Sequence, residues 1–92
     1  MKREYVDHVL SALTEELAAL EHERWSHWQR YMHGKGQRQS DGSLVLPAEL
    51  VARWERQMST GYVELNDEEK KSDREQVCLY LPLIATALID GR

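Results

Sequence analysis

The chain is short of several residue types, and each shortage excludes a class of protein. It contains one cysteine, Cys78, so it forms no internal disulfide and offers no multi-thiolate zinc site. Its net charge is −4, so no general attraction to nucleic acid or to an anionic membrane is expected. The longest apolar run, 78–89, is interrupted by Pro82 and falls short of the roughly 20 residues of a membrane span.

The composition that is present is typical of a folded domain. Of the 92 residues, 41% are hydrophobic and 30% are charged, so disorder, collagen-like repeats and coiled-coil arrays are poor interpretations. This length predicts a single helical domain over residues 1–92 with a modest core. The N-terminus continues into an amphipathic pattern rather than a signal-peptide core, so a cytoplasmic location is expected.

The N-terminal third predicts a long amphipathic helix from Tyr5 to about Met32. Thr14, followed by two glutamates, leaves open a break with a second helix starting there. Gly34 and Gly36 are expected to end the helix. Its apolar residues recur at three- and four-residue steps: Val6, Val9, Leu10, Leu13, Leu17, Leu20, Trp25, Trp28 and Met32.

A polar, glycine-rich segment follows, and residues 33–46 are interpreted as a flexible loop. A turn is predicted at Asp41-Gly42, and residues 44–46 are expected to be extended. Pro47 suits the first turn of a second helix ending near Thr60-Gly61. One face of that helix carries Pro47, Leu50, Val51, Trp54 and Met58.

Asn66 and Glu69 form a capping-box pattern that predicts a third helix starting at Asp67. Pro82 is expected to kink or split this helix, and Gly91 lies just past its predicted end. Its predicted buried stripe is Val77, Cys78, Leu81, Ile84, Ala85 and Leu88. The fold class is therefore all-α, a small bundle of three to four helices with a long first helix and a polar Gly-rich loop.

Two arginines occupy positions on the predicted apolar stripes. Arg24 projects along the stripe of the first helix, and Arg74 lies one turn before Cys78 on the third. A buried guanidinium needs an acidic or hydrogen-bonding partner. Two interpretations stay open: a structural ion-pair network with acids of this chain, or recognition of a ligand phosphate or carboxylate beside aromatic rings. The candidate acids are Glu21, Glu69 and Asp73.

Two segments carry a resemblance to a known family. His22-x-x-Trp25 forms the first, and the second contains Tyr62, Leu65, Glu69, Lys70, Asp73 and Arg74 in register. Together they resemble the ryanodine-receptor-type (RyR) domain over about half of the chain. Gly61 stands where the family has proline, and His33-Gly34-Lys35-Gly36 replaces its Gly-Trp-x-x-Gly segment. The resemblance implies a non-enzymatic module, similar to small standalone bacterial or phage proteins, that recognises nucleotide-derived or other small ligands.

Nothing in the sequence predicts catalysis. The serines and the cysteine lack a nearby base, and His8, His22, His27 and His33 lack the three- or four-residue spacing of a helical metal site. No cofactor and no metal are expected.

Two functions remain. The first is a regulatory or ligand-binding module for a nucleotide-like or other anionic small molecule. The alternative is a protein-interaction or self-assembling module, including a homodimer, that uses Trp54, Met58 and Met32 while the charged cluster is structural. Neither involves a membrane or nucleic acid. The candidate ligand-binding residues are His22, Arg24, Trp25, Trp28, Tyr62, Asp73 and Arg74.

Overall fold

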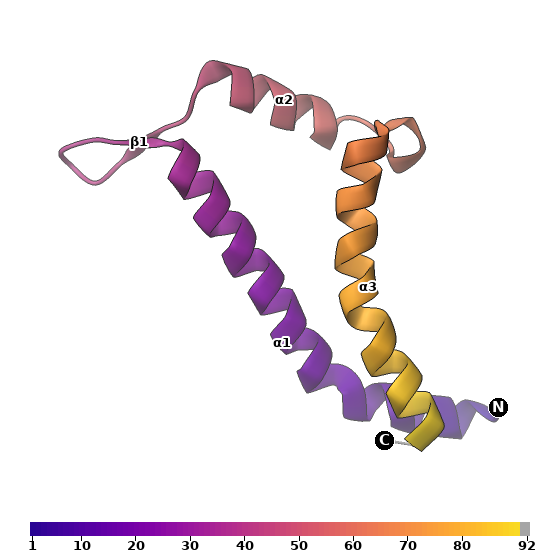
Figure 1. Ribbon diagram of the computed structural model, residues 1–92. Helices are drawn as coiled ribbons and strands as arrows, with labels where there is room; N and C mark the ends of the chain where they lie inside the picture. The colour runs from indigo at the N-terminus through magenta and orange to yellow at the C-terminus, as the bar shows by residue number, and fades with distance from the viewer. Residues whose placement is uncertain (91–92) are drawn as a thin grey trace.

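The computed structural model describes residues 1–90 and is mostly α-helical, with three helices and one small β-hairpin (Figure 1). The predicted α-helical class is confirmed, and the predicted position of Gly91 lies outside the described residues. The elements are α1 (Arg3–Lys35), β1 (Gln37–Arg38), β2 (Leu44–Val45), α2 (Ala48–Met58), the 3₁₀ turn η1 (Tyr62–Glu64) and α3 (Asp67–Asp90).

Helix α1 is continuous from Arg3 to Lys35, which confirms one long helix and excludes a break at Thr14. The Thr14 hydroxyl instead donates a hydrogen bond to the carbonyl of Leu10 within the helix (3.3 Å). Such back-bonding by threonine tends to bend a helix. In Figure 1 the first turns of α1 lie at an angle to the remainder of the helix.

The glycine-rich loop contains a hairpin. The Asp41 carboxylate accepts hydrogen bonds from the Ser43 amide (2.9 Å) and hydroxyl (2.6 Å), and Gly42 has a φ of 91°. The turn at Asp41-Gly42 is thus confirmed, because only glycine adopts this φ readily. β1 and β2 pair antiparallel. Strand β1 was not predicted from the sequence, since its residues are polar and the turn, rather than their own propensity, brings them to β2.

Helix α2 begins directly after Pro47, whose carbonyl accepts hydrogen bonds from the amides of Leu50 and Val51 (both 3.1 Å). The predicted start is confirmed. The helix ends at Met58, slightly before the predicted Thr60-Gly61.

The capping box of α3 is present as predicted. The Glu69 amide donates to the Asn66 side-chain oxygen (2.8 Å), and the Glu69 carboxylate accepts from the Asn66 amide (3.2 Å). These bonds satisfy backbone donors that would otherwise have no partner in the first turn. Helix α3 starts at Asp67 and continues through Pro82 without splitting.

The hydrophobic core is small and lies where α1 meets the C-terminal half of α3. Val9, Leu13 and Ala87 are its buried members. The Tyr5 hydroxyl also donates to the Leu88 carbonyl (2.8 Å), which ties the beginning of α1 to the end of α3. We call this whole region of contact between α1 and α3 the crossing. The half-buried residues around it are Leu17, Leu83, Ile84 and Leu88.

The predicted buried stripe of α3 is wrong in part. Val77, Cys78, Leu81 and Ala85 are exposed, while Ile84 and Leu88 are half-buried. Helix α1 instead covers the side of α3 that carries Leu83 and Ala87. The C-terminal half of α3 is apolar on more than one side, so periodicity could not determine which side faces α1.

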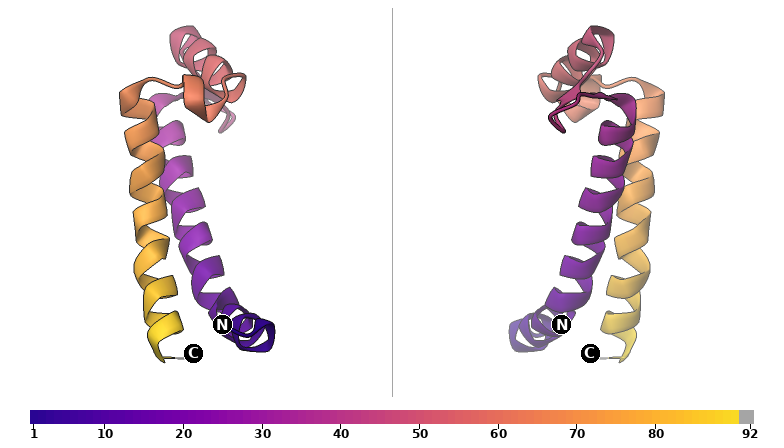
Figure 2. Two further views of the ribbon diagram at one scale, coloured as in Figure 1. Left: turned by 90° about the vertical axis from the view of Figure 1, so that its right-hand side faces the viewer. Right: turned by 90° about the vertical axis from the view of Figure 1, so that its left-hand side faces the viewer.

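The helices enclose an open triangle. α1 and α3 meet at the crossing and diverge toward their other ends, which α2 connects (Figure 1). Figure 2 shows the same arrangement edge-on as a thin plate, and the principal extents are 54 × 34 × 17 Å. The radius of gyration is 18.2 Å, whereas a compact domain of this length has roughly 12 Å. None of the helices described in residues 1–90 is long and apolar enough to span a membrane.

Candidate functional site

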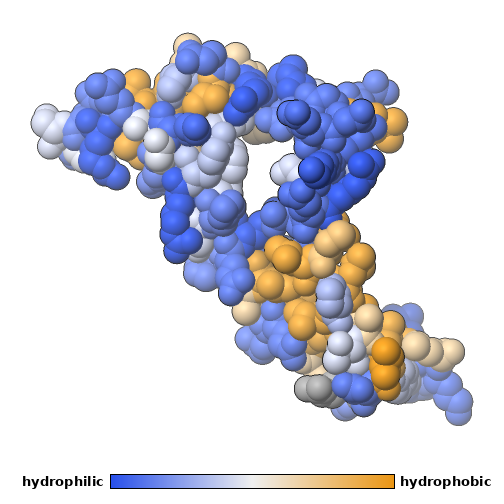
Figure 3. All heavy atoms as spheres, in the orientation of Figure 1, coloured by the Kyte–Doolittle hydropathy of each residue, from blue (hydrophilic) through white to orange (hydrophobic). Residues whose placement is uncertain are grey.

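The interior of the triangle is one of the concave features of the described chain. Figure 3 shows it as an opening between the upper halves of the helices, and the associated cavity has a volume of about 640 Å³. We call this cavity the window. Its lining is aromatic, basic and acidic: Arg24, His27, Trp28, Tyr31, Arg53, Trp54, Arg56, Gln57, Asn66, Glu68, Glu69, Ser72, Asp73, Glu75 and Gln76.

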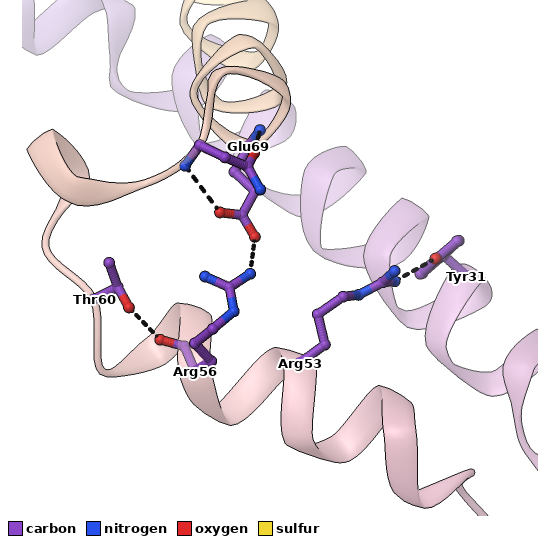
Figure 4. Close-up of polar contacts among 6 residues, drawn as sticks. Tyr31, Arg53, Arg56, Thr60 and Glu69 are labelled. Atoms are coloured by element: carbon purple, nitrogen blue, oxygen red, sulfur yellow. Dashed lines mark hydrogen bonds and ion pairs between the residues drawn. The ribbon is translucent and has the colours of Figure 1, made fainter.

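An aromatic cluster joins α1 to α2 at one corner of the window. Trp28 meets the Trp54 ring edge-on, with centroids 5.4 Å apart, and stacks on Tyr31 at 5.5 Å. An Arg53 guanidinium nitrogen lies 3.5 Å from the Tyr31 hydroxyl (Figure 4). Trp28 and Tyr31 stay exposed despite these contacts, because only α2 covers them.

An ion pair joins α2 to α3 at the second corner. A guanidinium nitrogen of Arg56 lies 2.5 Å from the Glu69 carboxylate, which also receives the Asn66 amide of the capping box (Figure 4). The Arg56 hydrogen bond is the main cause that lowers the pKa of Glu69 below its usual range. One carboxylate therefore both caps α3 and holds α2 against it.

A third set of contacts joins α1 to α3 between the window and the crossing. Arg24 donates to the Glu21 carboxylate (2.7 Å), and the Tyr80 hydroxyl donates to the other oxygen of that carboxylate. The Arg24 hydrogen bond and then the Tyr80 bond lower the pKa of Glu21. The same contacts raise the pKa of Arg24, because deprotonation would remove its attraction to the Glu21 carboxylate. They also raise the pKa of Tyr80, because deprotonation would remove the hydrogen bond to Glu21 and place a second negative charge beside that carboxylate.

The structure brings three of the predicted ligand-binding residues together. Arg24, Trp28 and Asp73 all line the window. Arg24 points toward α3 as its place on the stripe indicated, but it stays about half exposed because the helices have already diverged there. Its partner is Glu21, one of the acids predicted for it.

The other four predicted residues lie outside the window. His22 and Trp25 stack on each other on α1, with centroids 6.1 Å apart. Tyr62 lies in η1 with the Lys70 ammonium 5.8 Å from its ring centroid. Arg74 is exposed on α3 and makes no hydrogen bond or ion pair with residues 1–90. The predicted network linking Arg74 to Glu69 is replaced by the pair of Arg56 and Glu69.

Sequence reasoning missed the contribution of α2 to this region. Arg53 and Arg56 line the window beside Trp54, which had been assigned only to an apolar face or an interface. The spacing of Arg53, Trp54, Arg56 and Gln57, on one broad side of an amphipathic helix, was the available signal. No pattern could pair Arg56 with Glu69, since the turn between α2 and α3 decides that contact.

The arrangement offers recognition groups rather than reactive ones. Among residues 1–90, no group of three or more histidine, cysteine, aspartate or glutamate side chains is placed to hold a metal ion. Cys78 is a free, exposed thiol on α3, away from the window lining. The window can stack a planar group on tryptophan and offer guanidinium donors to an anion.

Comparison of the chain with protein-family models, with curated proteins and with solved structures finds no match. The resemblance to RyR domains therefore stays a prediction that rests on the two segments quoted above.

Proposed function

We propose that this chain is a non-enzymatic interaction module that completes its hydrophobic core against another polypeptide. The observation that carries this proposal is the size of the core. Only Val9, Leu13 and Ala87 are buried among residues 1–90, while large apolar side chains are exposed along α1 and α3, and Met58 is exposed on α2.

Burial of apolar surface is the main favourable term in folding, at roughly 25 cal/mol per Å². A chain that leaves this much apolar surface in water loses most of that stabilisation, and large exposed apolar patches in soluble proteins mark interaction sites. The sequence pattern itself predicts a bundle with wider burial than the single chain achieves. A partner helix laid against α1 or α3 supplies the missing contact.

A polypeptide partner explains the predicted interface residues as well. Met58 is exposed at the end of α2, Trp54 is half-buried on the same helix, and Met32 is half-buried on α1. Methionine and tryptophan are favoured at interfaces because they adapt to irregular surfaces or supply large contact areas. Function as a scaffold or regulator follows from binding, without a chemical step.

Sedimentation velocity combined with small-angle scattering of the same samples tests this proposal. Association, or a monomer whose radius of gyration is near 18.2 Å, is expected. A monomer that stays near the roughly 12 Å of a compact domain at every concentration would show that the chain covers its own apolar faces, and would contradict the proposal.

A second candidate function, ligand recognition in the window, is favoured by one observation. The cavity volume of about 640 Å³ lies within the roughly 300–1,000 Å³ of small-molecule sites, and the lining pairs Trp28 and Trp54 with Arg24, Arg53 and Arg56. The tryptophans suit a planar base. Arg24 and Arg56 are already paired with Glu21 and Glu69, so Arg53 is the guanidinium that would meet a nucleotide-like anion. This second candidate does not require the four predicted residues that lie outside the window, His22, Trp25, Tyr62 and Arg74.

Thermal-shift measurements with nucleotides, cyclic nucleotides and ADP-ribose test the second candidate. A ligand at about 100 times its Kd adds about 2.7 kcal/mol to the free energy of unfolding. Trp28→Ala should remove the shift, whereas Trp25→Ala, outside the window on the same helix, should keep it. A flat response to all ligands in the wild-type chain excludes this candidate.

A further inference from the structure

One side of α3 has no cover within residues 1–90. Val77, Leu81 and Ala85 recur at four-residue steps and therefore share a side of the helix, with Cys78 and Ile89 beside them. All five are exposed. We call these five residues the open face.

The open face is distinct from the side of α3 that α1 covers. At roughly 100° per residue, Leu81 lies about 120° around the helix from Ala87, which is buried at the crossing. No charged residue occurs between Glu75 and Asp90, so this half of α3 is apolar around most of its circumference. A helix with that pattern is normally buried on more than one side. Figure 3 shows apolar side chains gathered over the crossing and the adjoining part of α3.

The exposed area gives the size of the missing contact. A compact monomer of 10.8 kDa exposes roughly 5,500 Å², whereas this chain exposes 7407 Å², an excess of about 1,900 Å². If two chains each buried that excess, the interface would total about 3,800 Å², within the roughly 2,000–5,000 Å² of obligate homodimers. This excess is spread over the whole chain, so a dimer covers only part of it; covering half on each chain would bury about 1,900 Å² in total, which still reaches the size of a stable interface.

We infer that a second copy of this chain covers the open face, with α3 antiparallel to α3 of the partner copy. This inference rests on the proposed function and names its partner. A two-fold dimer uses the same patch on both chains, and the open face carries no charge that would repel itself. The helices α1 and α3 of the two copies then form a four-helix arrangement, whereas the bundle predicted from the sequence was formed by one chain.

Arg74 supplies charge complementarity in this arrangement. It lies on the side of α3 that carries Val77 and Leu81, and its side chain makes no hydrogen bond or ion pair with residues 1–90. Antiparallel pairing centred on Leu81 sets Val77 against Ala85 of the partner copy and brings Arg74 beside the last described turn of the partner's α3. A helix C-terminus carries a partial negative charge, so the unpaired guanidinium gains a partner there.

Leu81→Glu and Leu79→Glu form a matched pair of variants that tests the inference. The two side chains are 53% and 54% exposed on the same helix, but they point roughly 160° apart. The wild-type chain should sediment at twice 10.8 kDa. Leu81→Glu should raise the dimer Kd at least about a hundredfold, because each dimer would bury two unpaired carboxylates. Leu79→Glu should leave the mass unchanged.

Arg74→Glu is the second variant, because its exposed position makes misfolding no concern. Its Kd should rise roughly 3- to 30-fold, since two favourable contacts with helix ends are lost per dimer. Circular dichroism checks that each variant stays helical.

A wild-type monomer overturns the inference, as does a Leu81→Glu dimer. A monomer with a radius of gyration near 18.2 Å would leave the open face for another protein, so the proposed function would stand. A monomer with a radius of gyration near roughly 12 Å would contradict both the inference and the proposed function.

Discussion

The helices are held together in one way at the crossing and in another way around the window. At the crossing, Val9, Leu13 and Ala87 exclude water and stabilise the fold through burial. Around the window, α1, α2 and α3 are tied by ring contacts that solvent reaches and by the Arg56–Glu69 ion pair, whose guanidinium is half exposed. The comparison indicates that the crossing contributes more to stability than the window region does.

The largest expected effect comes from breaking the crossing. Leu13 is only 3% exposed, so Leu13→Ala should cost about 2–5 kcal/mol of unfolding free energy through lost burial and the cavity that remains. Chemical denaturation followed by circular dichroism measures this. Val63→Ala is the control, because Val63 is 76% exposed and its loss should stay within about 0.5 kcal/mol. Equal losses in the two variants would show that no core exists at the crossing.

A smaller effect is expected from the capping box at the start of α3. Asn66→Ala removes the side-chain acceptor of the Glu69 amide and should cost about 1 kcal/mol. Asn66→Ser keeps an acceptor and should preserve most of that stability. Hydrogen exchange of the amides in the first turn of α3 locates the loss. If both variants behave alike, the cap does not contribute.

The aromatic corner should show a measurable coupling between α1 and α2. A double-mutant cycle with Trp28→Ala and Trp54→Ala should give a coupling free energy of about 0.5–1.5 kcal/mol, as expected for an edge-to-face pair. The same cycle with Trp25 and Trp54 should give none, because Trp25 stacks on His22 instead. A measurable coupling between Trp25 and Trp54 would show that α2 packs against Trp25, which would contradict the observed contact with Trp28.

The ion pair of Arg56 and Glu69 should produce the smallest effect, visible as a pH dependence. The folded-state pKa of Glu69 lies below its ordinary value of 4.5, so the pair stabilises the fold above that pH. The contribution is lost as the pH falls through the lowered pKa. Thermal unfolding of Glu69→Gln should therefore differ from wild type at neutral pH and converge with it in acid. Glu64→Gln, in η1, should follow the wild-type profile throughout.

Local features of the fold were predictable because neighbouring residues create them. The long α1, the Asp41-Gly42 turn and the Asn66–Glu69 capping box all depend on contacts within a few residues. The candidate site was less predictable. Trp28 and Arg24 were recognised on α1, but their neighbours on α2 depend on how the chain turns between helices. Tyr62 and Arg74 were predicted for the site, but their side chains do not line the window.

The sequence by itself determined the three helices, the capping box of α3 and the turn at Asp41-Gly42. Hydrogen bonding and side-chain periodicity act over short distances, so a linear pattern contains them. Only the tertiary structure decided which side of α3 meets α1, since Leu83 and Leu81 are equally apolar and packing geometry alone distinguishes them. That packing buries one side of α3 at the crossing and leaves the open face exposed.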